Sequence, residues 1–299
     1  MLTDGNGMTA EMTIREFGPE TEGDATALIN AYIAKWPYCR PIDAALLAHW
    51  RTLGNLLQPR YMLIAYADGV PRAFLHGEVR PNYAFIHLLA TAPGAVAEGM
   101  RLVEAFEARA GETGKRELTG PSWNAALFYA GYILGREPCQ PHWAIDNTQV
   151  FVRSGYRIGT PAVLMKADLA QEVALEPLPD GYVLDDVAFP AEFDAQPFCC
   201  IARHDGQQVA LCGARLYPHQ AAPGGGIIGQ VGHVHTQESH RGKGLARILT
   251  KQCLHRLRAM GAAESLLATS LDNYPALAAY ERAGFVRWEL MPVWTKTMK

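Results

Sequence analysis

Two glycines, two basic residues and a preceding strand form the part of this chain best suited to binding an anion. Residues 227–236 are largely apolar and predict a strand, and an apolar pattern of helical spacing begins at Leu245. Between them the sequence reads Arg241-Gly242-Lys243-Gly244. Glycines let the backbone approach a ligand closely, and free N–H groups at the start of a helix attract negative charge. The stretch therefore predicts a diphosphate site between a strand and a helix.

Two common nucleotide-binding patterns do not fit this stretch. The dinucleotide pattern G-x-G-x-x-G needs a glycine where the chain has Arg247. The P-loop pattern needs a serine or threonine after Lys243, where the chain has Gly244. Taken alone, the loop could also be a glycine-rich surface loop whose basic residues are solvated.

A second group of residues predicts a helix with a polar hydroxyl on one face. Asn273 can cap the start of that helix, Pro275 fits its first turn, and Gly284 can end it in a left-handed conformation. Ala276 and Tyr280 are four residues apart and so lie on one face.

Both stretches resemble signatures of the GNAT superfamily of N-acetyltransferases. Arg241 to Ala246 is similar to its R/Q-x-x-G-x-G/A pattern, and Asn273 to Phe285 is similar to its N-x-x-A-x-x-x-Y-x-x-x-G-F pattern. The resemblance covers about the last third of the chain and implies that the loop holds the pyrophosphate of acetyl-CoA. The residues that it implies as contacts for this cofactor are Val234, His235, Thr236, Arg241, Gly242, Lys243, Gly244, Leu245, Ala246, Asn273 and Tyr280.

The resemblance also assigns catalytic roles. Tyr280 corresponds to the family's acid, and a phenol with a reference pKa of about 10 is protonated at neutral pH. A backbone N–H in Val234–Thr236 would polarise the thioester carbonyl. For the base that deprotonates the amine we favour His233, with Glu238 as a rival, although His233 could equally be structural. His235, on the same face of the strand, could instead pack beside the pantetheine arm of the cofactor. No third metal ligand accompanies the two histidines, so no metal is expected.

The order of elements in the second half repeats that in the first. Tyr61 to Gly69 parallels Phe198 to Gly206, and Phe151 to Tyr156 parallels Tyr280 to Phe285. We therefore expect a mixed α+β chain made of two tandem GNAT folds, each a mostly antiparallel twisted sheet flanked by helices. The predicted boundaries are residues 1–170 for the first domain, 171–180 for a linker and 181–299 for the second domain.

The two predicted domains are not equivalent. Where the second has its basic glycine loop, the first has Thr91-Ala-Pro-Gly94, and where the second has Tyr280, the first has Phe151. The first domain is therefore expected to be degenerate and the second catalytic. This layout is similar to that of tandem GNAT proteins of the mycothiol synthase type.

The walls of an acceptor site are expected to come largely from the first domain. Helices predicted at residues 24–35 and 43–57 have no counterpart in the second domain, so the first domain would supply the missing wall at the domain interface. The irregular segment 123–143, together with Trp36 and Trp50, could contribute aromatic surface there or simply fill the core.

Composition limits the possible functions. The chain has 299 residues, 49% of them hydrophobic, and a net charge of −3, which disfavours nucleic acid as a partner. No apolar run is long enough for a membrane helix, no secretory signal is visible, and Cys199, Cys200 and Cys212 fit buried free thiols. A cytoplasmic location follows as an expectation, and the oligomeric state stays open.

The sequence thus favours an acetyl-CoA-dependent N-acetyltransferase that acts on a small amine. The alternatives are a non-catalytic acyl-CoA-binding or regulatory protein, and an acyltransferase that uses another acyl-CoA or a peptide N-terminus.

Overall fold

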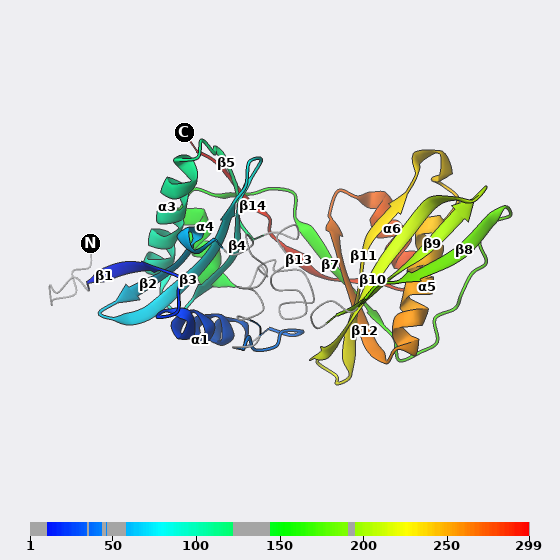
Figure 1. The fold of residues 1–299 in the computed structure, drawn as a ribbon, viewed down its shortest axis with the longest axis horizontal. Coiled ribbons are helices and arrows are strands. Elements are labelled where there is room, and N and C mark those ends of the chain that lie inside the picture. Colours follow the sequence, from blue (N-terminus) through cyan, green and yellow to red (C-terminus); the bar gives the residue numbers. More distant parts are fainter. Residues whose placement is uncertain are drawn as a thin grey trace.

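The chain folds around two seven-stranded sheets that lie side by side along its long axis (Figure 1). The computed structural model describes residues 11–34, 36–43, 46, 58–121, 144–190 and 195–298. Most of the predicted helix at 43–57, the segment 123–143 and Trp50 lie outside the described residues.

The first half contributes seven strands and three α-helices to the described part of the chain. In order these are β1 Met12–Glu16, α1 Glu22–Ile33, a 3₁₀ turn at Pro59–Tyr61, β2 Met62–Ala67, β3 Val70–Val79, β4 Ala84–Thr91, α3 Val96–Gly111, β5 Glu117–Thr119, α4 Ile145–Arg153, β6 Arg157–Ile158 and β7 Ala162–Asp168.

The second half has a similar order but no helix after its first strand among the described residues. Its elements are β8 Tyr182–Ala188, β9 Gln196–His204, β10 Gln207–Ala221, β11 Ile227–Thr236, a 3₁₀ turn at Glu238–His240, α5 Leu245–Ala259, β12 Ala262–Ser270, α6 Tyr274–Ala283, β13 Val286–Met291 and β14 Trp294–Thr297.

The predicted mixed α+β fold with mostly antiparallel sheets is confirmed. The strand orders are β1-β2-β3-β4-β5-β14-β6 and β13-β7-β12-β11-β10-β9-β8. Within these sheets the pairs β4·β5 and β11·β12 are parallel, and the remaining pairs are antiparallel.

The sheets do not divide at residues 171–180, where the sequence predicted the boundary. Strand β7 lies between β12 and β13 in the second sheet, and β14 lies between β5 and β6 in the first. Each half thus donates its last strand to the other half, and Figure 1 shows the chain returning from the second lobe to the first through β13 and β14. The connections between β6 and β7 and between β13 and β14 are short, so the chain crosses directly from one sheet to the next.

The same hairpin turn recurs in both halves, as the repeat predicted. Asp68 and Gly69 have φ values of 49° and 77°, and Asp205 and Gly206 have 50° and 75°. Two successive positive φ values are typical of the type I′ turn, whose twist suits an antiparallel hairpin. The repeat is therefore visible in backbone conformation as well as in sequence.

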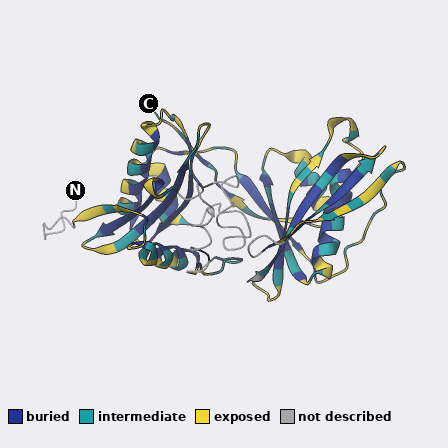
Figure 2. Cartoon of the chain, viewed as in Figure 1, coloured by how far each residue is buried: buried dark blue, intermediate teal, exposed yellow. Residues whose placement is uncertain are grey.

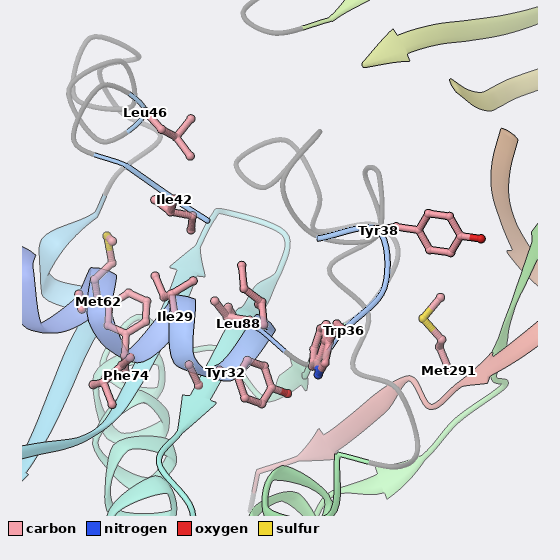
Figure 3. Packing of buried hydrophobic residues seen from close by; sticks show 14 of the residues in the cluster. Ile29, Tyr32, Trp36, Tyr38, Ile42, Leu46, Met62, Phe74, Leu88 and Met291 are labelled. Carbon is pink, nitrogen blue, oxygen red and sulfur yellow. The ribbon is translucent and has the colours of Figure 1, made fainter. Parts of the chain in front are cut away.

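Three apolar clusters hold these layers together, and their buried strands and helix faces are dark blue in Figure 2. One lies between the first sheet and α3, around Phe106, and another between the second sheet and α5, around Leu249. The third joins the halves, because it includes Trp36 and Tyr38 of the first half and Ile228 of the second. In Figure 3, Tyr38 points away from α1.

The segment predicted as a linker is attached to the second half. Leu178 packs against the apolar cluster under α5, and the carboxylate of Glu176 lies 2.6 Å from both Arg247 and Lys251 of that helix. These contacts fix the segment across the helix that begins at the glycine loop. Cys200 and Cys212 are buried free thiols as predicted, and so is Cys253, whereas Cys199 is a free thiol that is only half-buried. No helix in the described part of the chain is long and apolar enough to cross a membrane.

Candidate functional site

The site begins where two parallel strands separate. β11 pairs with β12 from Ile227 to Gln230, and beyond that point β12 continues with β7 on its other side. A register shift against β10 marks a bulge in β11 near His233, whose φ of 52° is left-handed. The end of β11, Val234–Thr236, therefore borders an opening in the sheet.

The glycine loop closes one end of this opening. Gly242 and Gly244 have φ values of 77° and 79°, and Gly244 is the N-cap residue that precedes α5. Side chains are disfavoured at such φ values, so glycine at both positions keeps the turn unstrained. The loop directs the start of α5 towards the gap between the strands.

Helix α6 forms the opposite wall. The Asn273 side chain accepts a hydrogen bond from the backbone N–H of Ala276 at 3.4 Å, Pro275 lies in the first turn, and Gly284 has a φ of 110°. The predicted cap, first-turn proline and left-handed end are all confirmed. They fix the helix so that the face carrying Ala276 and Tyr280 borders the opening.

Together these elements enclose a cavity of about 910 Å³. Each residue that the sequence predicted as a cofactor contact lines it: Val234, His235, Thr236, Arg241, Gly242, Lys243, Gly244, Leu245, Ala246, Asn273 and Tyr280. Pro275 and Ala276, which the sequence placed in the same helix as Tyr280, also line it, as do His240, Arg247, Ala278, Ala279 and Arg282, which the sequence did not predict as site residues. Ala276 lies one helical turn before Tyr280, whereas Ala278 and Ala279 are too close to Tyr280 in sequence for that spacing to have identified them.

Basic side chains give the cavity a positive lining. Arg241, Lys243, Arg247 and Arg282 all border it, and Arg247 also pairs with Glu176. Lys243 donates a hydrogen bond to the Tyr182 hydroxyl at 2.7 Å, and that hydroxyl lies 2.7 Å from Nδ1 of His240. Tyr182 on β8 thus connects two loop residues, a contact between distant segments that no local pattern could reveal.

Tyr280 is the buried hydroxyl of the site, with 8% of its surface exposed. Burial raises its pKa above the usual value of a phenol, and the nearby Cys212 thiol raises it further. The hydroxyl therefore stays protonated at neutral and moderately alkaline pH and can act as a proton donor.

The predicted base lies at the edge of this arrangement. His233 and His235 are exposed, and Glu238 is exposed in the 3₁₀ turn after the strand. His235 lines the cavity, whereas His233 is not among its lining residues. The β-carbon of His233 faces Gly213 on β10, where an added β-carbon would lie 3.6 Å away.

The cavity is compatible with a coenzyme A thioester. Its volume lies within the range of about 300–1,000 Å³ that is usual for small-molecule sites. Backbone N–H groups of a glycine turn, a helix start and two basic side chains suit a diphosphate. The small side chains Ala276 and Ala279 leave room for a narrow chain between α6 and the end of β11.

Comparison with known proteins agrees with this geometry. Residues 166–285 match the acetyltransferase (GNAT) family. The chain is 43% identical over 58 residues to a mycothiol acetyltransferase of Corynebacterium glutamicum (strain R), covering 19% of this chain and 20% of that protein. It is 35% identical over 88 residues to a mycothiol acetyltransferase of Nocardioides sp., covering 28% and 30% respectively. The chain thus matches less than a third of the length of either relative.

The whole fold has a counterpart among solved structures. A tandem GNAT protein from the clavulanic acid biosynthesis pathway superposes with a TM-score of 0.72 at 16% identity, covering 96% of this chain and 98% of that one. Residues 166–285 are therefore similar to GNAT acetyltransferases, and the chain shares the fold of that tandem GNAT protein.

Proposed function

We propose that this chain transfers the acetyl group of acetyl-CoA to the amino group of a small acceptor. The observation that carries the proposal is the cavity of the second half, where a left-handed glycine loop, a separated strand pair and a buried tyrosine meet. A protein that merely senses acyl-CoA would need the loop but not the buried hydroxyl.

Cofactor binding, polarisation of the thioester and protonation of the thiolate are assigned to different groups of this chain. The backbone of Gly242–Gly244 with Arg241 and Lys243 binds the diphosphate of the cofactor. An N–H of Val234–Thr236 polarises the carbonyl of the thioester, because β11 is no longer paired with β12 there. Tyr280 donates its proton to the departing thiolate. Burial raises the pKa of Tyr280, so its hydroxyl carries the proton that this step needs at neutral pH.

The acceptor binds beside the interface between the halves. The first half covers one part of the second sheet, where Tyr38 donates a hydrogen bond to Glu264 and its ring meets that of Trp288 edge-on at 5.1 Å. His233 and His235 stay exposed at the far end of β11. An amine that approaches this end reaches the cavity beside His235.

His233 serves as the base in this proposal. A neutral imidazole titrates near neutral pH and can accept the proton of an ammonium group. His233→Asn is the suitable variant, because asparagine tolerates the left-handed φ of 52°. It should lower kcat by about 100-fold and remove the acidic limb of the pH–rate profile. An unchanged limb would assign the base to another group, such as His235.

The test of the function is release of free thiol from acetyl-CoA in the presence of a panel of amino sugars, amino acids and aminoglycosides. At least one should give acetylated amine with stoichiometric thiol. Binding of acetyl-CoA without turnover of any small amine or peptide N-terminus would instead favour a binding or regulatory protein. A preference for propionyl- or succinyl-CoA, or for a peptide, would favour the other acyltransferase alternatives.

A further inference from the structure

The first half contains a cavity of its own. It has a volume of about 490 Å³ and lies between α1, the loop after β4 and the start of α4. The loop after β4 and the start of α4 correspond to the loop after β11 and the start of α6 at the larger cavity, whereas α1 has no counterpart there. Its lining residues are Ala27, Leu28, Ala31, Tyr32, Trp36, Pro71, Thr91, Ala92, Pro93, Ala144, Ile145, Asp146 and Asn147.

A buried amide blocks the position where a thioester arm would enter. β4 pairs with β5 only at Ala84 and Phe85. Beyond these pairs, the Asn147 side chain donates hydrogen bonds to the Leu89 carbonyl and the Tyr32 hydroxyl, each at 2.5 Å. It also accepts one from Thr91 at 2.7 Å. Asn147 is 1% exposed and its amide makes three hydrogen bonds, which hold it in this gap.

The charge of this cavity is opposite to that of the cofactor cavity. Among its described lining residues none is basic, and Asp146 supplies a carboxylate. One oxygen of Asp146 accepts a hydrogen bond from the Gly94 backbone at 3.3 Å. The nearby Arg72 donates to the Pro93 carbonyl at 3.2 Å and lies 3.6 Å from Glu98. A phosphate would therefore be repelled, whereas a cation would be attracted.

The remaining walls are apolar and aromatic. Ala27 and Ala31 lie one helical turn apart on α1 and are exposed to the cavity, which leaves space beside them. Trp36 meets Tyr32 edge-on with ring centroids 4.6 Å apart, and Figure 3 shows the two rings beside each other at the end of α1. An aromatic wall near a carboxylate suits a ligand with an apolar body and an ammonium group.

We propose that this cavity is a binding site for a small primary amine with an aromatic or apolar body. Asp146 pairs with its ammonium group, and Trp36, Leu28 and the two alanines contact its body. The site is separate from the acetyl-transfer cavity and does not depend on the function proposed for that cavity. It gives the degenerate half a ligand of its own that is not coenzyme A.

The test uses 2-phenylethylamine as the probe and 3-phenylpropionate as its anionic counterpart. Binding of each compound to the complete chain is measured at pH 7 by calorimetry and by saturation-transfer NMR. The amine should bind at least about tenfold more tightly than the acid. Asp146→Asn keeps the oxygen that accepts from Gly94 and should remove this preference. Ala31→Trp, at an exposed position, should abolish binding, whereas Ala108→Phe on the exposed face of α3 should leave it unchanged.

Three results would overturn the proposal. They are no binding of the amine at 10 mM or below in the unchanged protein, equal binding of the acid, and binding that survives in Ala31→Trp. The last result would place the amine elsewhere, for example at the acceptor position of the second half. Circular dichroism of each variant separates loss of binding from loss of fold.

Discussion

The two cavities show how one arrangement of strands and helices can be used in opposite ways. In the second half, residues 237–244 form a long glycine loop with two basic residues, and Ala276 leaves the gap between the strands open. In the first half, residues 92–95 form a shorter loop, and Asn147 fills the gap. Asn147 and Ala276 each precede the key aromatic, Phe151 or Tyr280, by one helical turn. The fold provides the opening, and the charge of the loop together with the side chain at this position decides whether it can hold a ligand arm.

The largest effect is expected from Gly244→Glu in the glycine loop. A side chain at φ 79° costs about 1–2 kcal/mol, and a carboxylate would repel a diphosphate. The Kd for acetyl-CoA measured by calorimetry should rise by about 100-fold or more. Gly94→Glu is the matched control in the first half, at φ 75°, and should leave acetyl-CoA affinity unchanged. A loss of affinity in the control would mean that the first half also binds the cofactor.

Tyr280→Phe should separate chemistry from binding. Removing the proton donor should lower kcat by about 10²–10⁴-fold, while the Kd for acetyl-CoA stays within about twofold. The change copies the first half, where Phe151 occupies the corresponding place. Single-turnover release of thiol is the measurement, and near-normal rates would assign the acid to another group.

Exchanging the residues found at the equivalent positions 147 and 276 should have effects of intermediate size. Ala276→Asn would crowd the opening between α6 and β11 and should weaken acetyl-CoA binding about tenfold. Asn147→Ala should not create acetyl-CoA binding, because the loop of the first half lacks basic residues. It should instead lower the free energy of unfolding by about 1–3 kcal/mol in urea titrations, since its three partners lose hydrogen bonds. Binding of acetyl-CoA by the first half of this variant would contradict the comparison.

The smallest expected effect is on the pH dependence of the rate of acetyl transfer. Because burial and the Cys212 thiol raise the pKa of Tyr280 above its usual 10, the hydroxyl remains protonated as pH rises from 8 to 10. The rate of acetyl transfer should therefore stay flat over this interval, and Tyr280→Phe should show the same flat profile at its lower level. The free energy of unfolding depends on pH in the same direction. Because the pKa of Tyr280 is higher in the folded chain than in the unfolded chain, its contribution to stability is fully present below pH 10 and is lost only as the pH rises further. A fall in kcat centred below pH 9 that disappears in Tyr280→Phe would contradict a raised pKa.

Local features of the site could be predicted from sequence, because their causes are local. The cap at Asn273, the left-handed Gly284 and the glycines of the loop depend on residues a few positions apart. Contacts made by distant segments could not be predicted. Tyr182 reaches Lys243 from the edge of the sheet, and Glu176 reaches Arg247 from the supposed linker, and neither pairing leaves a pattern in the sequence.

The exchanged strands were missed for a similar reason. β7 carries an apolar pattern that predicts a strand, but which sheet it joins depends on the space left between β12 and β13. β6 and β14 are too short to give a clear pattern. A boundary drawn from composition alone therefore fell after β7, although that strand completes the second sheet.

The exchange of β7 and β14 between the halves also constrains how the chain can fold while it is being synthesised. The first sheet needs residues 294–297 to fill the position between β5 and β6, and those residues leave the ribosome long after the rest of that sheet. Domains usually fold one after another as they emerge. Here the sheet of the earlier half cannot be completed until β14 has been synthesised, so the two halves cannot finish folding one after the other.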